Sequence, residues 1–121
     1  MQNLIIKIEE SNDIINSKLI SFSGDFDGYI KENLTEILEL TENATEETKL
    51  IFDFTNLNYL NSYAIGHIVA WHNKLAEKKG EIIVIGINKN VEDIFSILGV
   101  NSLFKTFPNL ESAKKGIESM I

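Results

Sequence analysis

The sequence of 121 residues has no cysteine, one proline and, among its 11 basic residues, no arginine. Without cysteine, a disulfide framework, a thiolate nucleophile and a thiolate zinc site are excluded, and only 2 histidines remain for metal chemistry. Because proline is scarce and neither a repeat nor a low-complexity segment occurs, no linker is indicated. The length suffices for one hydrophobic core, so we expect a single domain over residues 1–121.

Two further absences concern membranes and nucleic acids. No apolar run approaches the roughly 18 residues of a membrane span, and the first residues lack a basic segment followed by a long apolar one. The 11 basic residues against 18 acidic ones leave a net charge of -7, which repels a polyphosphate backbone. We therefore expect a soluble, cytoplasmic protein that neither inserts into membranes nor binds nucleic acid, and the lack of cysteine fits that reducing compartment.

Apolar residues recur with strand and helix periods in alternation along the chain. Short apolar runs predict five strands, at residues 3–8, 18–23, 50–54, 81–87 and 102–107. Helical periods predict four helices, one in each interval from the second strand onward. The connection between the first two strands is too short for a crossover helix, so these strands should pair antiparallel. The order ββαβαβαβα predicts an α/β (α+β) fold, a mixed sheet with helices packed on it.

Several residues between these segments have structural interpretations. Asp27, Asn90 and Asn109 stand where the N-caps of the first, third and fourth helices are expected. Gly99 suits the end of the third helix, and Gly24 suits a turn before the first one. These residues therefore need no function beyond shaping the chain.

Two small polar residues, Asn61 and Ser62, separate the third predicted strand from the second predicted helix. Either could be the helix N-cap, whose side-chain oxygen accepts a backbone N–H that otherwise lacks a partner. The same geometry suits a modification, because free N–H groups and the helix macrodipole stabilise an added phosphate. A hydroxyl at this junction could therefore carry a switch that acts on a partner's surface.

The residues around this junction resemble the anti-sigma factor antagonist family, also called STAS domains. The resemblance covers nearly the whole chain, including SGDFD at residues 23–27, which is similar to the family's Gly-Glu-Leu-Asp segment, and ILGVNSLF at residues 97–104. It implies a STAS-like fold, with Ser62 as the phosphoacceptor of a serine kinase that is also the anti-sigma factor. In that family the unphosphorylated protein binds the kinase, the phosphorylated form lets go, and a serine phosphatase resets it.

The phosphoserine loop of this family typically reads Asp-Ser-Ser/Thr-Gly-Leu/Ile-Gly. Asn61 replaces the Asp, Tyr63 the Ser or Thr, and Ala64 the first Gly, while Ile65 and Gly66 agree. The resemblance implies that Asn61, Tyr63, Ala64 and Gly66 form a loop next to the phosphate. It also implies protein binding rather than catalysis, with no cofactor in this chain, because ATP belongs to the kinase.

A candidate docking face follows from the helical wheel of the second helix. Opposite the expected core face lies an aromatic and mildly basic stripe: Tyr63, His67, Ala70, Lys74 and Lys78, with Trp71 at its edge. Aromatic residues are enriched at interfaces, so the stripe beside the candidate phosphoserine could contact the kinase. An alternative interpretation tucks Trp71 against the sheet. Asp25 and Asp27 are secondary candidates, because the family places their segment near the phosphoserine loop.

Two alternatives assign another function: one keeps the STAS fold without phosphorylation, and the other uses Ser62 as a catalytic nucleophile. A STAS module that is never phosphorylated would only scaffold a signalling or lipid-transport assembly. A hydrolase would pair Ser62 with His67, but the sequence lacks a signal for an oriented base, a third partner or an oxyanion site. His67 and His72 are five residues apart, which puts them on different helix faces and argues against a shared metal.

A third alternative is a response-regulator receiver with Asp53 as its phosphoacceptor. Glu9 and Glu10 would then be the magnesium-binding acids, and Lys105 the receiver's lysine. A receiver needs two strand-helix-strand crossovers before its third strand, whereas one helical segment precedes residue 50. The structural interpretation makes Asp53 a polar residue at a strand end and both glutamates part of a turn.

Overall fold

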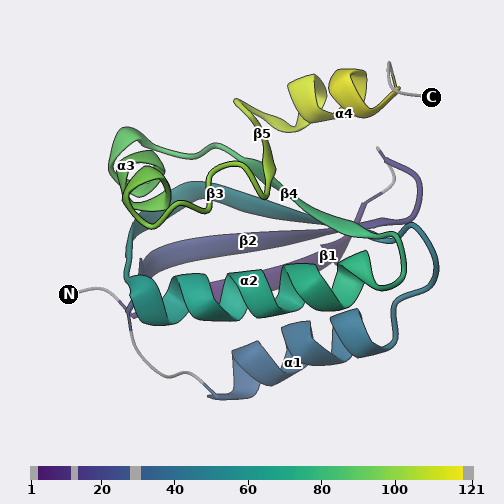
Figure 1. Ribbon diagram of the computed structural model, residues 1–121, viewed down its shortest axis with the longest axis horizontal. Helices are drawn as coiled ribbons and strands as arrows, with labels where there is room; N and C mark the ends of the chain where they lie inside the picture. The colour runs from purple at the N-terminus through teal and green to yellow at the C-terminus, as the bar shows by residue number, and fades with distance from the viewer. Residues whose placement is uncertain (1–2, 12–13, 28–30, 119–121) are drawn as a thin grey trace.

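The computed structural model describes residues 3–11, 14–27 and 31–118. Five strands form one sheet in the order β1-β2-β3-β4-β5. The strands are β1 (Ile5–Glu10), β2 (Ser17–Phe26), β3 (Lys49–Leu60), β4 (Glu81–Ile85) and β5 (Lys105–Phe107). The helices are α1 (Lys31–Glu42), α2 (Ser62–Ala76), α3 (Lys89–Ile97) and α4 (Leu110–Glu118). This element order and the mixed α/β architecture confirm the predicted fold class (Figure 1).

The first two strands pair antiparallel, as predicted, and every later neighbour pair is parallel. Parallel strands need crossover connections, and α1, α2 and α3 supply them one after another. Because β2, β3 and β4 run parallel to one another, their carboxyl ends lie at the same end of the sheet. The junction between β3 and α2 lies at that end of the sheet.

The two faces of the sheet carry separate hydrophobic clusters (Figure 1). On one face, α1, α2 and α3 cover an aromatic core built on Phe22, Phe52 and Phe54, all fully buried. On the other face, α4 packs over an aliphatic cluster that includes Ile51 and Ile83. Successive strand residues point to opposite faces, so β3 contributes to both clusters. Burial of each large side chain stabilises the fold by about 1.5–3 kcal/mol.

The third strand is longer than the five apolar residues that predicted it. β3 continues through Leu57 to Leu60, and both leucines are fully buried. The continuation is possible because β2 also extends, so that Asp25 pairs with Tyr59 and Phe26 with Leu60. The apolar pattern did not predict this extension, because Asn58 and Tyr59 stand between the two leucines.

Three local predictions were wrong. Gly24 lies inside β2 rather than in a turn, with φ of 96° beside a register shift to Asp25, so it serves a bulge that favours glycine. Glu10 pairs with Lys18, which makes the last residues of β1, Glu9 included, part of the ladder rather than of the turn. The N-cap of α3 is Asn88, two residues before the predicted cap Asn90.

Other predicted helix ends agree with the structure or fall outside it. Asn109 caps α4, because its Oδ1 accepts the N–H of Ser112 at 2.8 Å. Gly99 follows α3 with φ of 71°, and its N–H bonds to the Ser96 carbonyl at 3.1 Å. The predicted capping of the first helix by Asp27 involves residues 28–30, which lie outside the described residues.

Candidate functional site

A single residue joins β3 to α2. Leu60 ends the strand in the core, Asn61 follows in an extended conformation, and Ser62 already begins the helix. The predicted loop is therefore reduced to the single residue Asn61. Tyr63, Ala64 and Gly66 lie in the first two turns of α2 instead of in a loop. That part of the prediction was wrong because the Asn61 cap starts α2 at Ser62, so these residues are helical.

Asn61 fixes this junction with both ends of its amide. Its Oδ1 accepts the N–H of Ala64 at 3.1 Å, which makes Asn61 the N-cap of α2. Its Nδ2 donates to the carbonyl of Asp27 at 3.0 Å, and its own N–H donates to the carbonyl of Phe26 at 3.3 Å. The cap therefore also ties α2 to the end of β2.

Because Asn61 is the cap, the hydroxyl of Ser62 is not used for capping. Ser62 is exposed on the first helical position of α2. The N–H groups of Ala64 and Ile65 bond to Asn61, whereas those of Ser62 and Tyr63 precede the intrahelical hydrogen bonds. A phosphoryl group on Ser62 would stand at the positive end of the helix macrodipole, next to these N–H groups.

The segment that contains Asp25 and Asp27 lies directly beside the junction. Asp25 pairs with Tyr59 across the β2–β3 ladder, and the backbone of Asp27 accepts the Asn61 amide. The structure thus brings together two segments that are more than thirty residues apart in the sequence. The contribution of the two aspartates to partner binding stays a prediction.

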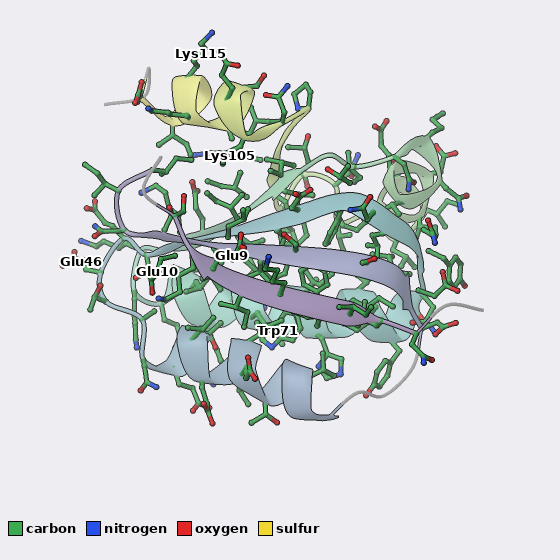
Figure 2. All side chains as sticks on the ribbon, turned by 180° about the vertical axis from the view of Figure 1, so that it is seen from behind. Glu9, Glu10, Glu46, Trp71, Lys105 and Lys115 are labelled. Carbon is green, nitrogen blue, oxygen red and sulfur yellow. The ribbon has the colours of Figure 1, made fainter. Side chains whose placement is uncertain are left out.

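Three rings one turn apart connect the exposed start of α2 to the core. Tyr63 is 40% exposed and meets His67 edge-on with ring centroids 4.8 Å apart, and His67 meets Trp71 at 5.7 Å. Trp71 is only 2% exposed and contacts the rings of Phe26 and Phe52. The alternative interpretation of Trp71 holds: it packs against the sheet, so it does not belong to an exposed docking face (Figure 2).

The basic part of the predicted stripe contacts α1 instead of surrounding Ser62. Lys74 lies about 18 Å along the helix from Ser62. Its Nζ approaches Glu42 Oε1 at 4.0 Å, and Lys78 Nζ donates to the Glu42 carbonyl at 2.6 Å. The structure therefore divides the stripe: Tyr63 and His67 remain near the junction, whereas both lysines hold the end of α1.

Sequence reasoning missed two features near the junction. Tyr59 is 41% exposed on β3, on the strand that leads to Ser62. Asn88 repeats the arrangement of Asn61 at the next junction, because its Oδ1 accepts the N–H of Val91 at 2.8 Å and its Nδ2 donates to the Leu57 carbonyl at 2.8 Å. The shared signal was available in the sequence: each asparagine follows a buried strand and precedes a helix.

The topology overturns the receiver alternative. A receiver-type sheet has the order 2-1-3-4-5, whereas here the first strand is an antiparallel edge strand. Asp53 lies within β3 rather than at its end, and its Oδ1 accepts from the N–H and hydroxyl of Thr55 at 2.9 and 2.6 Å. Glu9 and Glu10 come from β1 and Lys105 from β5, at opposite edges of the sheet (Figure 2).

Two exposed lysines outside the junction each pair with a neighbouring acid. A side-chain hydrogen bond to Glu9 raises the pKa of Lys7, and one to Asp93 raises the pKa of Lys89. Among the described residues, no group of three His, Cys, Asp or Glu side chains could hold a metal ion. His72 is half-buried, with its ring against Phe104 at 5.2 Å. None of the helices that the structure describes has the length and apolar character needed to cross a membrane.

Comparison with known proteins identifies relatives over nearly the full chain. Residues 6–113 match the family described as STAS domain. The anti-sigma-B factor antagonist of Listeria monocytogenes is 26% identical over 115 residues, which cover 94% of this chain and 96% of that protein.

Solved structures show the same fold at low sequence identity. An anti-sigma factor antagonist from Mycobacterium paratuberculosis has a TM-score of 0.78 and 17% identity, over 96% of this chain and 95% of that one. SpoIIAA in its unphosphorylated form has a TM-score of 0.72 and 15% identity, over 97% and 99% of the two chains. Its phosphorylated form has a TM-score of 0.68 and 15% identity, over 97% and 100%.

Proposed function

The chain belongs to the STAS domain family, and from this premise we propose that it is an anti-sigma factor antagonist controlled by phosphorylation of Ser62. In its unphosphorylated form it would bind a serine kinase that is also the anti-sigma factor. Phosphorylation would release it, and a serine phosphatase would restore it. The observation that carries the proposal is the exposed Ser62 hydroxyl, held on the first residue of α2 by the Asn61 cap.

The names of the relatives support the role of anti-sigma factor antagonist. The Listeria relative is an anti-sigma-B factor antagonist, and SpoIIAA is an anti-sigma factor antagonist that exists in both an unphosphorylated and a phosphorylated form. A cytoplasmic location and a role in transcription regulation belong to the same proposal.

The geometry supports a switch that changes the surface and leaves the fold intact. Phosphorylation adds about -1.5 to -2 charges and three acceptor oxygens. At the first position of α2 these are favoured by the macrodipole and by the N–H groups of Ser62 and Tyr63, so the helix itself tolerates the change. A partner that packs closely on Ser62 would instead have to bury the new charge, which weakens binding.

The surface around Ser62 has the character of a protein-binding site. Tyr59 and Tyr63 are each about 40% exposed, and the exposed Gly66 has no side chain that would hold a partner away. Tyrosines are enriched at interfaces because they bury a large area at a small loss of conformational freedom. We infer that the kinase contacts these residues together with His67, and that Asp25 and Asp27 border the contact.

Binding of the kinase to variants at position 62 tests this function. Ser62→Asp should weaken binding at least about tenfold, because the carboxylate must be buried without a partner, whereas Ser62→Ala should bind as the unmodified protein does. The matched control is Ser112→Asp, a serine in the first turn of α4 on the opposite face of the sheet. Equal loss in both aspartate variants, or none at position 62, would contradict control through Ser62.

A further inference from the structure

β1 forms one edge of the sheet along its whole length. It pairs with β2 on one side, and no other strand of the described residues lies along its outer side. The register with β2 runs from Ile5 to Glu10 without a shift, so no bulge interrupts this edge. In Figure 2, β1 is the purple strand that carries Glu9 and Glu10, and it lies in front of β2 with no helix before it. Its outward N–H and C=O groups therefore form a template for a further strand.

β1 has few of the features that normally keep an edge strand from pairing. Proteins protect such edges with short strands, proline, bulges and charged side chains, above all lysine. β1 has 6 residues and no proline, whereas the opposite edge strand, β5, has 3 residues. Ile6 and Ile8 pack on the larger hydrophobic cluster, and Ile5 on the other face is 64% exposed. The remaining protection on the face of Ile5 is the charge of Lys7, which disfavours a partner strand unless that strand offers an acid.

Lys7 and Glu9 make this edge complementary to itself. Their side chains are 72% and 43% exposed and share one face of the strand, with Lys7 Nζ 2.9 Å from Glu9 Oε1. When a second copy pairs antiparallel about a two-fold axis at Ile8, each Lys7 lies opposite Glu9 of the other copy. Residues opposite one another in paired strands have Cβ atoms about 4.5–5.5 Å apart, so four charges of alternating sign come together. The two Ile8 side chains meet at the axis on the other face, where they extend the larger hydrophobic cluster.

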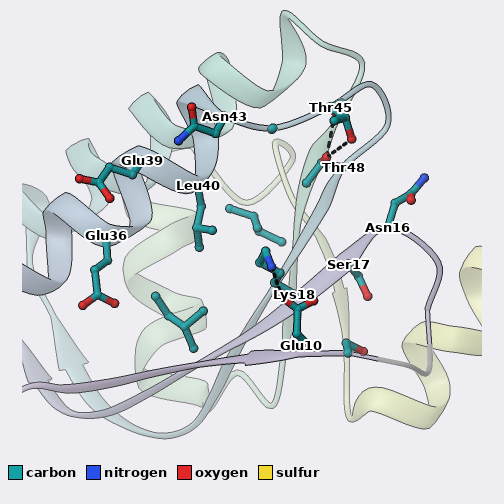
Figure 3. A pocket seen from close by; sticks show the side chains of 14 residues that line it. Glu10, Asn16, Ser17, Lys18, Glu36, Glu39, Leu40, Asn43, Thr45 and Thr48 are labelled. Carbon is teal, nitrogen blue, oxygen red and sulfur yellow. Dashed lines mark hydrogen bonds and ion pairs between the residues drawn. The ribbon is translucent and has the colours of Figure 1, made fainter.

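The adjacent registers of the same pairing bring like charges together. A two-fold axis at Lys7 sets two ammonium groups opposite each other, and an axis at Glu9 does the same with two carboxylates. The axis at Ile8 avoids both arrangements. It also leaves Glu10 with its own cation, because that carboxylate forms an ion pair with Lys18 of the same chain (Figure 3). The charge pattern therefore favours the register centred on Ile8 over those on either side.

We propose that the chain forms a weak symmetric dimer in which the β1 strands of two copies pair antiparallel about Ile8. One pair of short strands buries less than the roughly 1,200–2,000 Å² of stable complexes, so we expect a dissociation constant on the order of 100 μM. An extended segment of another protein fits less well, because it need not carry an acid opposite Lys7 and a lysine opposite Glu9. The dimer is independent of the function proposed for Ser62, since β2 separates β1 from the strand that leads to Ser62.

Sedimentation velocity of the full chain over a concentration series tests the dimer. Between about 10 μM and 1 mM, the mean sedimentation coefficient should rise from that of a monomer toward that of a dimer. Lys7→Glu and Glu9→Lys should each weaken dimerisation at least about tenfold, because like charges then face each other across the axis. Glu111→Lys, which reverses an exposed acid in the ion pair with Lys115 on α4, is the matched control and should dimerise as the unmodified protein does.

Mixing the two single variants separates strand pairing from an effect on folding. In a mixed dimer, the two acids of the Lys7→Glu chain face the two lysines of the Glu9→Lys chain, so an equimolar mixture should dimerise at least as tightly as the unmodified protein. An unmodified protein that stays monomeric at about 1 mM would overturn the proposal. Single variants that dimerise like the control, or a mixture that stays monomeric, would overturn it as well. Ser62→Asp should dimerise unchanged, so the outcome is separate from that of the kinase experiment.

Discussion

At the scale of single residues, two asparagines fix the starts of α2 and α3 at the end of the sheet where Ser62 lies. Asn61 and Asn88 each cap a helix with Oδ1 and each donate through Nδ2 to a backbone carbonyl at or near the end of the preceding parallel strand. An aspartate could accept as a cap but could not donate to that carbonyl. The replacement of the family's usual Asp by Asn61 therefore exchanges a charge for a hydrogen bond that joins α2 to β2.

Removing the Asn61 amide should destabilise the protein. Asn61→Ala loses the cap on Ala64 and the bond to Asp27, so we expect the free energy of unfolding to fall by about 1–2 kcal/mol. Asn61→Asp keeps the acceptor and should lose less. Urea unfolding measures both, with Asn101→Ala in an exposed turn as the control. An alanine variant as stable as the control would show that the cap does not hold this junction.

Gly66 should separate stability from binding. A Cβ at this position meets nothing within 4 Å, so Gly66→Ala should raise the free energy of unfolding by about 0.5–1 kcal/mol through helix propensity. If the kinase packs on this part of α2, the added methyl group should weaken kinase binding in the same variant. Unfolding and binding titrations on one sample measure both, and a stabilised variant with unchanged affinity would remove Gly66 from the interface.

At the scale of elements, the apolar pattern was enough to predict the order of strands and helices, because each helix buries one face and the central strands β3 and β4 bury both. Residues 50–54 and 81–87 stood out because they are mostly apolar, with Asp53 the one charged residue of the first run and Glu81 that of the second. The continuation of β3 to Leu60 was not predictable from this pattern, because its extra residues are stabilised by the neighbouring β2 rather than by their own composition. The loop predicted around Ser62 was wrong because Asn61 caps α2 and the helix begins at Ser62.

The site was predictable to the extent that it depends on local chemistry. Ser62 at the start of a helix, with Asn61 as a candidate cap, could be inferred from residue types alone. The burial of Trp71 could not, since a helical wheel places it at the edge of the apolar face and tertiary packing against Phe52 decides its environment. Likewise, the engagement of Lys74 with Glu42 depends on where α1 lies in space.

The attachment of α4 should depend on one glycine. A Cβ on Gly116 would lie 2.4 Å from the ring of Phe107, so in Gly116→Ala either that ring or α4 itself must shift. We expect a loss of about 1–3 kcal/mol and faster hydrogen exchange in α4 than in α2. Gly66→Ala is the matched control, a helical glycine in open space. Unchanged exchange in α4 would contradict the close packing of this helix on β5.

At the scale of the whole molecule, the central strands unite both hydrophobic clusters. Because β3 and β4 contribute side chains to each face, neither face can lose its packing without disturbing the other. That residues 1–121 form a single domain stays a prediction made from the length of the chain.

Unfolding should therefore be cooperative. Trp71 is the one tryptophan of the chain and lies in the larger cluster, so its fluorescence reports on one face while far-ultraviolet circular dichroism reports on all helices. The two transitions in urea should coincide, as expected of a two-state domain. Separate midpoints would indicate that α4 and its cluster unfold as an independent unit.

The most direct test of the central claim is to incubate the protein with its cognate serine kinase and ATP and to map the phosphate by mass spectrometry. The account predicts one phosphate, on Ser62, and none in Ser62→Ala. Phosphate on another residue, or intact kinase binding without any phosphate transfer, would contradict the switch, and the second outcome would leave a scaffold that uses the same fold.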